Sequence, residues 1–488
     1  MSDSSTWQLR SFLMELISAH LSEDDGATLT SKTWDIYWKA VSSKHPSSLL
    51  LAEYISLDFA ALLSNPTSTI ELLCRYYTML HDLYRDPAQR MSDIQRFDTN
   101  AVIPFAEWLK GRYHASNREK PRSAEAHLKI GYLCTWGLFT PDSPAPNILA
   151  ALISEQAHLA NRQVYTYITV ASDPAFVSAV SQSTVRDYAC GYNFTNLDDL
   201  YQSIVSDGID VLIADIPTAT ATYLFCRRAA PMQILLDIGA PFWSVPGLDW
   251  VLTHNRNPEL NVSFSRSIQS SVLLAQAQGT QPSPQISSLR LPPPNSPLVL
   301  GNFGRVSKLS PEFIIAVKEI LRRLPQALFL VLGKGSSPSF SRLLHDPEFS
   351  DRVKHFDQPA SIDDVLYFGR ALHIFIDSFP LTGSHSIYRA LSLGLPVVSR
   401  FSPDVDRLAL QERDEMLLTW NSDAYIDMVC RLANDHQFYS DSSKRSLSIA
   451  PIFNDTSRMI ADVESGISSA IAHYSTITMR RTNNLSRF

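Results

Sequence analysis

The chain has 488 residues, of which 45% are apolar and 19% are charged, a composition typical of a globular protein with a substantial core. At about 150 residues per domain, this length predicts roughly three domains. The formal net charge of -7 argues against nucleic acid as the main partner, because a phosphate backbone selects basic surfaces. A local basic pocket for a small phosphate ligand is compatible with that charge.

The sequence contains no stretch with the pattern of a membrane span. The best candidate, Leu49–Leu63, contains Glu53 and Asp58 and is too short to cross a bilayer. Glu15 splits the first apolar stretch, so we expect no cleaved leader. The five cysteines are scattered and form no metal-type pair, which favours reduced, buried thiols. We expect a soluble cytoplasmic protein.

The first 127 residues predict an all-helical N-terminal domain. Apolar residues recur at the spacing of one helix face early in the chain, and similar patterns follow around Trp34–Val41, Leu49–Leu63, Ile70–Tyr84 and Ala101–Tyr113. Ser, Asp and Pro separate these stretches. No fixed-period repeat is present, so we expect a helical bundle and not a solenoid.

Residues 128–280 have a different pattern, in which short apolar strands alternate with helices. The expected strands are Lys129–Cys134, Val164–Val170, Val211–Ile213 and Val251–Thr253, and one expected helix is Asn147–Ala160. This alternation indicates a parallel sheet covered on both faces, which forms the first lobe. Prolines among Gln and Ser mark residues 281–297 as a linker.

The alternation restarts in residues 298–472, which form the second lobe. The expected strands are Leu298–Leu300, Leu328–Leu332, Ile374–Ile376 and Val397–Ser399, and the expected helices are Pro311–Arg323, Ile362–Arg370 and Ser386–Leu393. Residues 473–488 are expected to be a loosely held tail. The fold class is therefore α/β, with two nucleotide-fold-like lobes that face each other across a cleft. Ligands of such sheets bind outside the carboxyl ends of the strands.

A loop with two cations follows the first strand of the second lobe. It contains Asn302, Arg305 and Lys308, and the next helix is expected to have Ser310 as its cap and Pro311 in its first turn. Cations before a helix N-terminus oppose the helix dipole unless an anion lies between them. A bound diphosphate would reverse this, with each charge-assisted hydrogen bond contributing roughly 1.5–3 kcal/mol. We therefore predict a phosphate site; the alternative is that both side chains are only solvated.

A turn of small residues opens the helix after strand Ile374–Ile376. Gly383, Ser384, His385 and Ser386 lie at this helix start, where backbone N–H groups can approach a phosphate closely and the dipole favours negative charge. Because the turn and the cationic loop belong to one lobe, we expect both to bind the same phosphate. The alternatives are an ordinary capped helix and a His385 that only begins it.

Short segments in both lobes follow one another in a recognisable order. They are Asp207–Ile213, Arg228–Gln233, Gly239–Pro241, Asp249–Trp250, Asn302–Lys308, Asp377–Ser386 and Gly394–Pro396. In this order, residues 129–470 resemble glycosyltransferase family 41, the group of O-GlcNAc transferases and bacterial cytoplasmic N-glycosyltransferases. The helical N-terminal segment, without evident tetratricopeptide repeats, is more similar to the second branch.

The resemblance implies a GT-B fold, in which two Rossmann-like lobes follow the helical domain. The first lobe is then the acceptor side, with Gln233 near the acceptor, and the second lobe is the nucleotide-sugar donor side. The resemblance also implies that Lys308 contacts the donor diphosphate, with Asn302 and Arg305 in the same loop. Many relatives hold the donor ribose with an acidic residue on the helix after the phosphate turn, and Arg389 takes that place.

Arg389 leaves three alternatives: ribose recognition has moved, the donor differs, or donor binding is weakened. A buried cation there would need a partner. Relatives also carry a histidine in the loop after the first strand of the first lobe, but Trp136–Asn147 has none. Asp142 is the only titratable group of that loop and is the candidate base by default. The alternative is a turn-stabilising aspartate.

No metal-ligand pattern is visible in the sequence, so we expect neither metal nor cofactor. The expected reaction is inverting, metal-independent transfer of a hexose or N-acetylhexosamine from a UDP-sugar to an Asn, Ser or Thr side chain of a protein. Lys308, assisted by Arg305, would stabilise the departing diphosphate. Two alternatives stay open: a transferase acting on glycan or small-molecule acceptors, and a non-catalytic subunit that recognises protein and supports another transferase.

Overall fold

The structure, a computed structural model, describes fifteen segments of the chain. They are residues 103–113, 121–134, 145–169, 174–188, 197–215, 219–237, 245–253, 268–271, 297–335, 337–357, 362–380, 382–383, 385–401, 417–453 and 455–474. The helices expected before residue 101, nearly all of the linker and most of the tail lie outside these residues.

The first lobe is a parallel sheet in the order β3-β2-β1-β4-β5-β6-β7. Its strands are β1 (Leu128–Cys134), β2 (Arg162–Ile168), β3 (Thr184–Asp187), β4 (Val211–Ala214), β5 (Met232–Asp237), β6 (Trp250–Thr253) and β7 (Ile268–Ser271). Its helices are α8 (Ala145–Ala157), α9 (Pro174–Ala179), α10 (Leu197–Asp207) and α11 (Ala219–Cys226). Strands β1 and β4 are almost wholly buried, as expected where helices cover both faces of a parallel sheet.

The second lobe repeats this topology, with strand order β10-β9-β8-β11-β12-β13. Its strands are β8 (Val299–Phe303), β9 (Leu328–Leu332), β10 (Val353–Phe356), β11 (Ile374–Ile376), β12 (Val397–Arg400) and β13 (Leu417–Thr419). Its helices are η4 (Val306–Lys308), α14 (Pro311–Arg323), α15 (Pro338–Leu344), α16 (Ile362–Gly369), α17 (His385–Ser392), α19 (Ser422–Asn434) and α20 (His436–Phe453). The strand order reverses between β8 and β11, which is the switch point where ligands bind in open α/β sheets.

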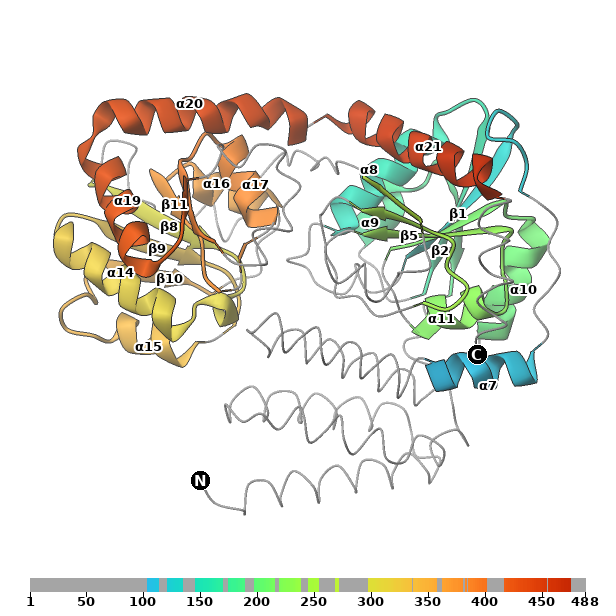
Figure 1. Cartoon of the computed structure of the whole chain (residues 1–488), viewed down its shortest axis with the longest axis horizontal. Coiled ribbons are helices and arrows are strands. Elements are labelled where there is room, and N and C mark those ends of the chain that lie inside the picture. Colours follow the sequence, from blue (N-terminus) through green and yellow to red (C-terminus); the bar gives the residue numbers. More distant parts are fainter. Residues whose placement is uncertain are drawn as a thin grey trace, which may run out of the picture.

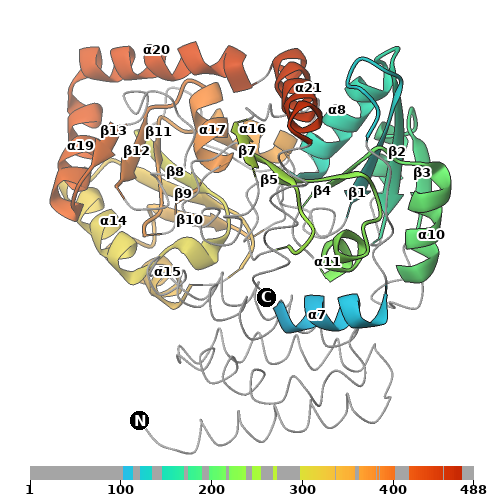
Figure 2. The ribbon, with the colours of Figure 1, turned by 45° about the vertical axis from the view of Figure 1, so that its right-hand side comes forward.

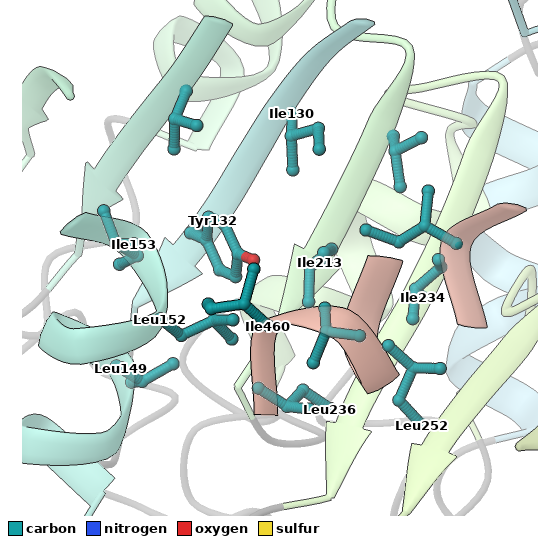
Figure 3. Close-up of a cluster of buried hydrophobic side chains, with 14 of the residues drawn as sticks. Ile130, Tyr132, Leu149, Leu152, Ile153, Ile213, Ile234, Leu236, Leu252 and Ile460 are labelled. Carbon is teal, nitrogen blue, oxygen red and sulfur yellow. The ribbon is translucent and has the colours of Figure 1, made fainter. Parts of the chain in front are cut away.

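The last described helix, α21 (Thr456–Ala472), returns to the first lobe. Helix α20 lies along the second lobe and α21 lies over the first (Figures 1 and 2). Ile460 of α21 lies among side chains of β1, β4 and α8, including Tyr132, Leu152 and Ile213 (Figure 3). These residues were predicted in the second lobe, but the apolar face of α21 is buried in the core of the first.

Helix α7 (Ile103–Arg112) belongs to the N-terminal region, and it lies against α11 of the first lobe (Figure 2). Arg227, just after α11, places its guanidinium carbon 4.1 Å from the ring centre of Tyr113 and 3.9 Å from that of Tyr201. Arg227 also forms an ion pair with Asp198. The cation–π contact between Arg227 and Tyr113 links the end of α7 to the first lobe.

The expected elements of both lobes are confirmed with small changes at their ends. Helix α14 and strands β9 and β11 have the predicted bounds. Ser310 caps α14 by accepting a hydrogen bond from the amide of Phe313, and Pro311 begins the helix. The cap and the proline made this boundary readable from the sequence.

Candidate functional site

The candidate site lies at the switch point of the second lobe, where the ends of β8, β9 and β11 meet. After β8, the amide of Gly304 donates to the carbonyl of Leu332 at 3.0 Å. Gly304 and Gly333 both have positive φ, at 151° and 149°. A Cβ atom on Gly333 would lie 1.9 Å from the carbonyl oxygen of Gly304, so no side chain fits there. The two backbones thus form a side-chain-free floor for the site.

Asn302 is the fourth residue of β8, two residues before Gly304. Its side chain is buried, and its amide donates to the carbonyl of Ile376 at the end of β11, over 2.9 Å. Asn302 therefore ties the two strands of the switch point together. Because this hydrogen bond engages the side-chain amide, the predicted contact of Asn302 with the donor would have to coexist with it.

Lys308 links the loop before α14 to the turn before α17. Its ammonium donates to the carbonyl of Thr382 at 2.8 Å, and the side chain is half-buried. Ser310 makes a parallel link, since its hydroxyl donates to the carbonyl of Phe379 at 2.6 Å. The cationic loop and the small-residue turn, which are far apart in sequence, are therefore in contact. Arg305 in the same loop is exposed.

The turn before α17 uses two of its amides within the protein. The amide of Gly383 donates to the carboxylate of Asp377 at 2.7 Å, and that of Ser386 donates to the carbonyl of Gly383 at 2.9 Å. A Cβ atom on Gly304 would lie 3.5 Å from the hydroxyl oxygen of Ser386. The hydroxyl of Ser386 therefore faces the end of β8. His385 begins α17 and is half-buried, whereas Ser384 lies outside the described residues.

Asp377 follows β11 directly and is fully buried beneath the turn. Its carboxylate accepts hydrogen bonds from the hydroxyls of Thr382 and Ser399, each at 2.7 Å, in addition to the Gly383 amide. Burial raises the pKa of Asp377 to about 6, although these three donors and the charge of Lys308 favour the ionised form. Near neutral pH the group is a carboxylate held by hydrogen bonds.

Arg389 lies one turn into α17 and is 6% exposed. Burial lowers the pKa of its guanidinium to about 10, so it keeps its charge at neutral pH. Arg389 is thus a buried cation within α17.

Gln233, the residue predicted on the acceptor side, lies in the core of the first lobe. Gln233 is the second residue of β5 and is fully buried, at the amino edge of its sheet. Its amide donates to the carbonyls of Phe225 and Gly247 at 3.0 and 2.8 Å. Because these bonds engage its amide, we assign Gln233 no acceptor role. Asp142 lies outside the described residues.

Sequence reasoning did not single out Asp377, Gly304 or Gly333 as site residues. The signal for Asp377 was an apolar strand that ends in one carboxylate before a Thr-Gly turn. Within the described residues, no His, Cys, Asp or Glu side chains form a group of three or more that could hold a metal ion. No helix in that part of the chain is long and apolar enough to cross a membrane.

Comparison with known proteins identifies the fold. No family model matches the chain, and no curated protein matches it in sequence. The structure is similar to that of a mutant O-GlcNAc transferase from Thermobaculum terrenum, with 19% identity, a TM-score of 0.58, and coverage of 98% of this chain and 99% of that one.

Two further structures are similar over a smaller share of this chain. HepE from Anabaena, in complex with UDP and glucose, has 17% identity and a TM-score of 0.51 over 70% of this chain and 100% of its own. A glycosyltransferase from Rickettsia africae has 10% identity and a TM-score of 0.50 over 72% and 98%. The two parallel-sheet lobes of this chain therefore have the GT-B fold found in glycosyltransferases.

Proposed function

We propose that the chain is a glycosyltransferase that binds a UDP-sugar at the switch point of its second lobe. The observation that carries the proposal is the bond between the Lys308 ammonium and the Thr382 carbonyl, which places a cation at the amino end of α17. The positive charge and the helix dipole both favour an anion there. The Ser386 hydroxyl faces the same place from the first turn of α17.

A diphosphate is the anion that suits this arrangement best. The floor formed by Gly304 and Gly333 lets a bulky anion approach the backbone closely. Lys308 supplies one charge to a phosphate oxygen, and the amino end of α17 supplies partial positive charge beside it. HepE, which shares the fold, binds UDP in its structure, and this supports a UDP-linked donor here.

The proposed reaction is inverting and independent of a metal ion. When the bond between sugar and diphosphate breaks, negative charge develops on the leaving phosphate oxygen. Lys308 and the start of α17 lie where they would stabilise this charge, with Arg305 assisting from the exposed side of the loop. Fixed groups of this kind need no reorganisation as the charge forms.

We propose a protein side chain, Asn, Ser or Thr, as the acceptor. The order of sequence segments in both lobes supports it, and so does the full-length similarity to an O-GlcNAc transferase. Asp142 remains the proposed base. A peptide acceptor and a free sugar acceptor, compared in the same assay, would distinguish this proposal from a transferase that acts on glycans or small molecules.

The buried Arg389 favours a second candidate function, that of a non-catalytic subunit that supports another transferase. A cation where relatives carry a ribose-binding acid would weaken or change nucleotide recognition. This candidate predicts no turnover by the chain alone.

The test is donor hydrolysis and thermal shift with a panel of nucleotide sugars, without added metal. We expect one UDP-sugar to stabilise the protein and to release UDP, and Lys308→Ala to slow the release by about 10²–10³. Lys354→Ala is the matched control, because Lys354 is exposed on β10, at the edge of the sheet away from β11. If no nucleotide sugar binds or reacts, the proposal is wrong and the supporting-subunit candidate takes its place.

A further inference from the structure

The carboxylate of Asp377 accepts two hydrogen bonds from the turn before α17, which is part of the candidate site. We propose that Asp377 is a positioning residue for the donor diphosphate, which fixes the turn before α17 and, through the Thr382 carbonyl, the ammonium of Lys308. The inference rests on the proposed function and adds to it a residue that would touch no substrate.

The carboxylate joins three parts of the second lobe. Its two oxygens accept from Thr382 and Gly383 in the turn and from Ser399 in β12. The backbone of Asp377 is fixed as well, since its carbonyl accepts from the Tyr425 hydroxyl of α19 at 3.0 Å. The turn is therefore held against a rigid base formed by β11, β12 and α19.

The same turn anchors the lysine. Thr382 donates its hydroxyl to Asp377 and accepts the Lys308 ammonium at its carbonyl, so one residue carries both bonds. A displacement of Thr382 would move the ammonium away from the amino end of α17. Asp377 thus acts on Lys308 through one intervening residue.

The packing of the turn leaves little room for adjustment. A Cβ atom on Gly383 would lie 3.0 Å from a carboxylate oxygen of Asp377 and 3.1 Å from Cβ of Ser386. The Gly383 amide is part of the backbone and cannot rotate to find another acceptor, whereas the hydroxyls of Thr382 and Ser399 can. The carboxylate is consequently the acceptor that fixes the backbone of the turn.

A buried carboxylate next to an anion site costs free energy, both because it is removed from water and because it repels the anion. Its burial raises its pKa, which shows that the surroundings disfavour the charge. Its charge would also repel a diphosphate. If Asp377 were only a background charge, removal of that charge would tighten nucleotide binding. If it positions the turn and Lys308, the same change would weaken binding, so the two roles predict opposite signs.

The experiment measures the dissociation constant of UDP, donor turnover and melting temperature for Asp377→Asn and Thr382→Val. The asparagine keeps the shape of the aspartate, and the valine removes only the hydroxyl that Asp377 accepts from. We expect each change to weaken UDP binding by about tenfold, the size expected when a positioned charge-assisted bond is loosened, with no fall in melting temperature for Asp377→Asn. Combining Asp377→Asn with Lys308→Ala should weaken UDP binding little beyond Lys308→Ala alone. Asp377 acts through the Lys308 ammonium, so its removal has little further effect once that ammonium is absent.

Asp249→Asn is the matched control, since Asp249 is also a buried aspartate but lies in the first lobe. It should lower the melting temperature and leave UDP affinity unchanged. Tighter or unchanged UDP binding by Asp377→Asn would overturn the positioning role, and so would additive losses in the double variant. If the wild type binds UDP but turns over no donor, the proposed reaction fails while these affinities still test Asp377. A wild type that does not bind UDP overturns both.

Discussion

The two lobes share one strand order, and two of their buried aspartates, Asp249 and Asp377, lie at opposite edges of the sheets. In the first lobe, Asp249 lies just before β6, at the amino edge of the sheet, and forms an ion pair with Arg228. In the second lobe, Asp377 lies just after β11, at the carboxyl edge, and its carboxylate is held by two hydroxyls and an amide. One carboxylate is bonded to a neighbouring cation, and the other holds a turn.

The difference separates a stabilising contact from a positioning one. Arg228 has a φ of 61°, and its guanidinium also donates to the carbonyls of Gly247 and Pro231, each at 2.6 Å. This cluster closes the edge of the sheet that binds no ligand in α/β folds. Asp377 supports the edge where ligands bind, so its removal should affect binding more than stability.

The largest expected effect on stability is that of Arg228→Ala. The change would remove the cation paired with the buried Asp249, and breaking a buried ion pair costs about 3–5 kcal/mol. Urea unfolding followed by circular dichroism measures this loss. UDP affinity of the folded protein should stay the same, because the second lobe is untouched.

Arg322→Ala is the control for that change, since Arg322 and Glu348 form an ion pair that is half exposed. It should alter the unfolding midpoint little, because solvent screens such pairs. An Arg228→Ala protein as stable as this control would show that the buried cluster of the first lobe is not the stabilising contact we describe.

The largest expected effect on turnover is that of Lys308→Ala. Loss of a group that stabilises developing negative charge lowers turnover by about 10²–10³, or about 2.7–4 kcal/mol of activation free energy. Stability should change little, because the lysine is half-buried at the end of the short helix η4. Steady-state kinetics with the donor found in the panel gives this ratio. A turnover within twofold of the wild type would remove Lys308 from the mechanism.

Much of the second lobe could be predicted from the sequence because its elements are short and have clear boundaries. Ser310 and Pro311 mark the start of α14, and Gly394 and Pro396 mark the end of α17. Helix α21 was predicted in the second lobe, but it packs on the first. Its apolar face identifies it as a packed helix, but local sequence does not say which sheet it packs on.

The placement of two candidate residues could be predicted for the same reason. Lys308 and Gly383 could be placed on one lobe, since both follow strands of the same sheet. The role of Gly383 could not be predicted, because its amide donates to Asp377, six residues earlier, and this bond depends on how the turn folds back. The burial of Gln233 and Arg389 likewise follows from packing across the lobe.

The pH dependence of stability should show the effect of burying the Asp377 carboxylate. Its pKa rises from 3.8 to about 6 on folding, so between these values the folded protein holds a proton that the unfolded chain has released. The free energy of unfolding should therefore fall as pH rises from about 4 to about 6, by about 3 kcal/mol from this group, and level off above. Urea unfolding across this range, for wild type and Asp377→Asn, isolates the contribution.

The asparagine variant should lack this contribution, so its stability relative to the wild type should increase with pH and then stay constant. Asp249→Asn provides the comparison from the first lobe. If wild type and Asp377→Asn show parallel pH profiles, the carboxylate is not strained by burial, and the contrast between the two lobes loses its energetic basis.

The smallest expected effect comes from one methyl group added at the turn, in Gly383→Ala. Its Cβ would press on Asp377 and on Ser386, at 3.0 and 3.1 Å, and overpacking of this kind costs about 1–3 kcal/mol. Gly111→Ala in α7 is the matched control, because a Cβ there meets nothing within 4 Å. That change should stabilise the helix by about 0.5–1 kcal/mol. Weaker UDP binding by Gly383→Ala, with no change in Gly111→Ala, would show that the backbone of the turn and its carboxylate act as one unit; equal binding by both would separate the turn from the nucleotide.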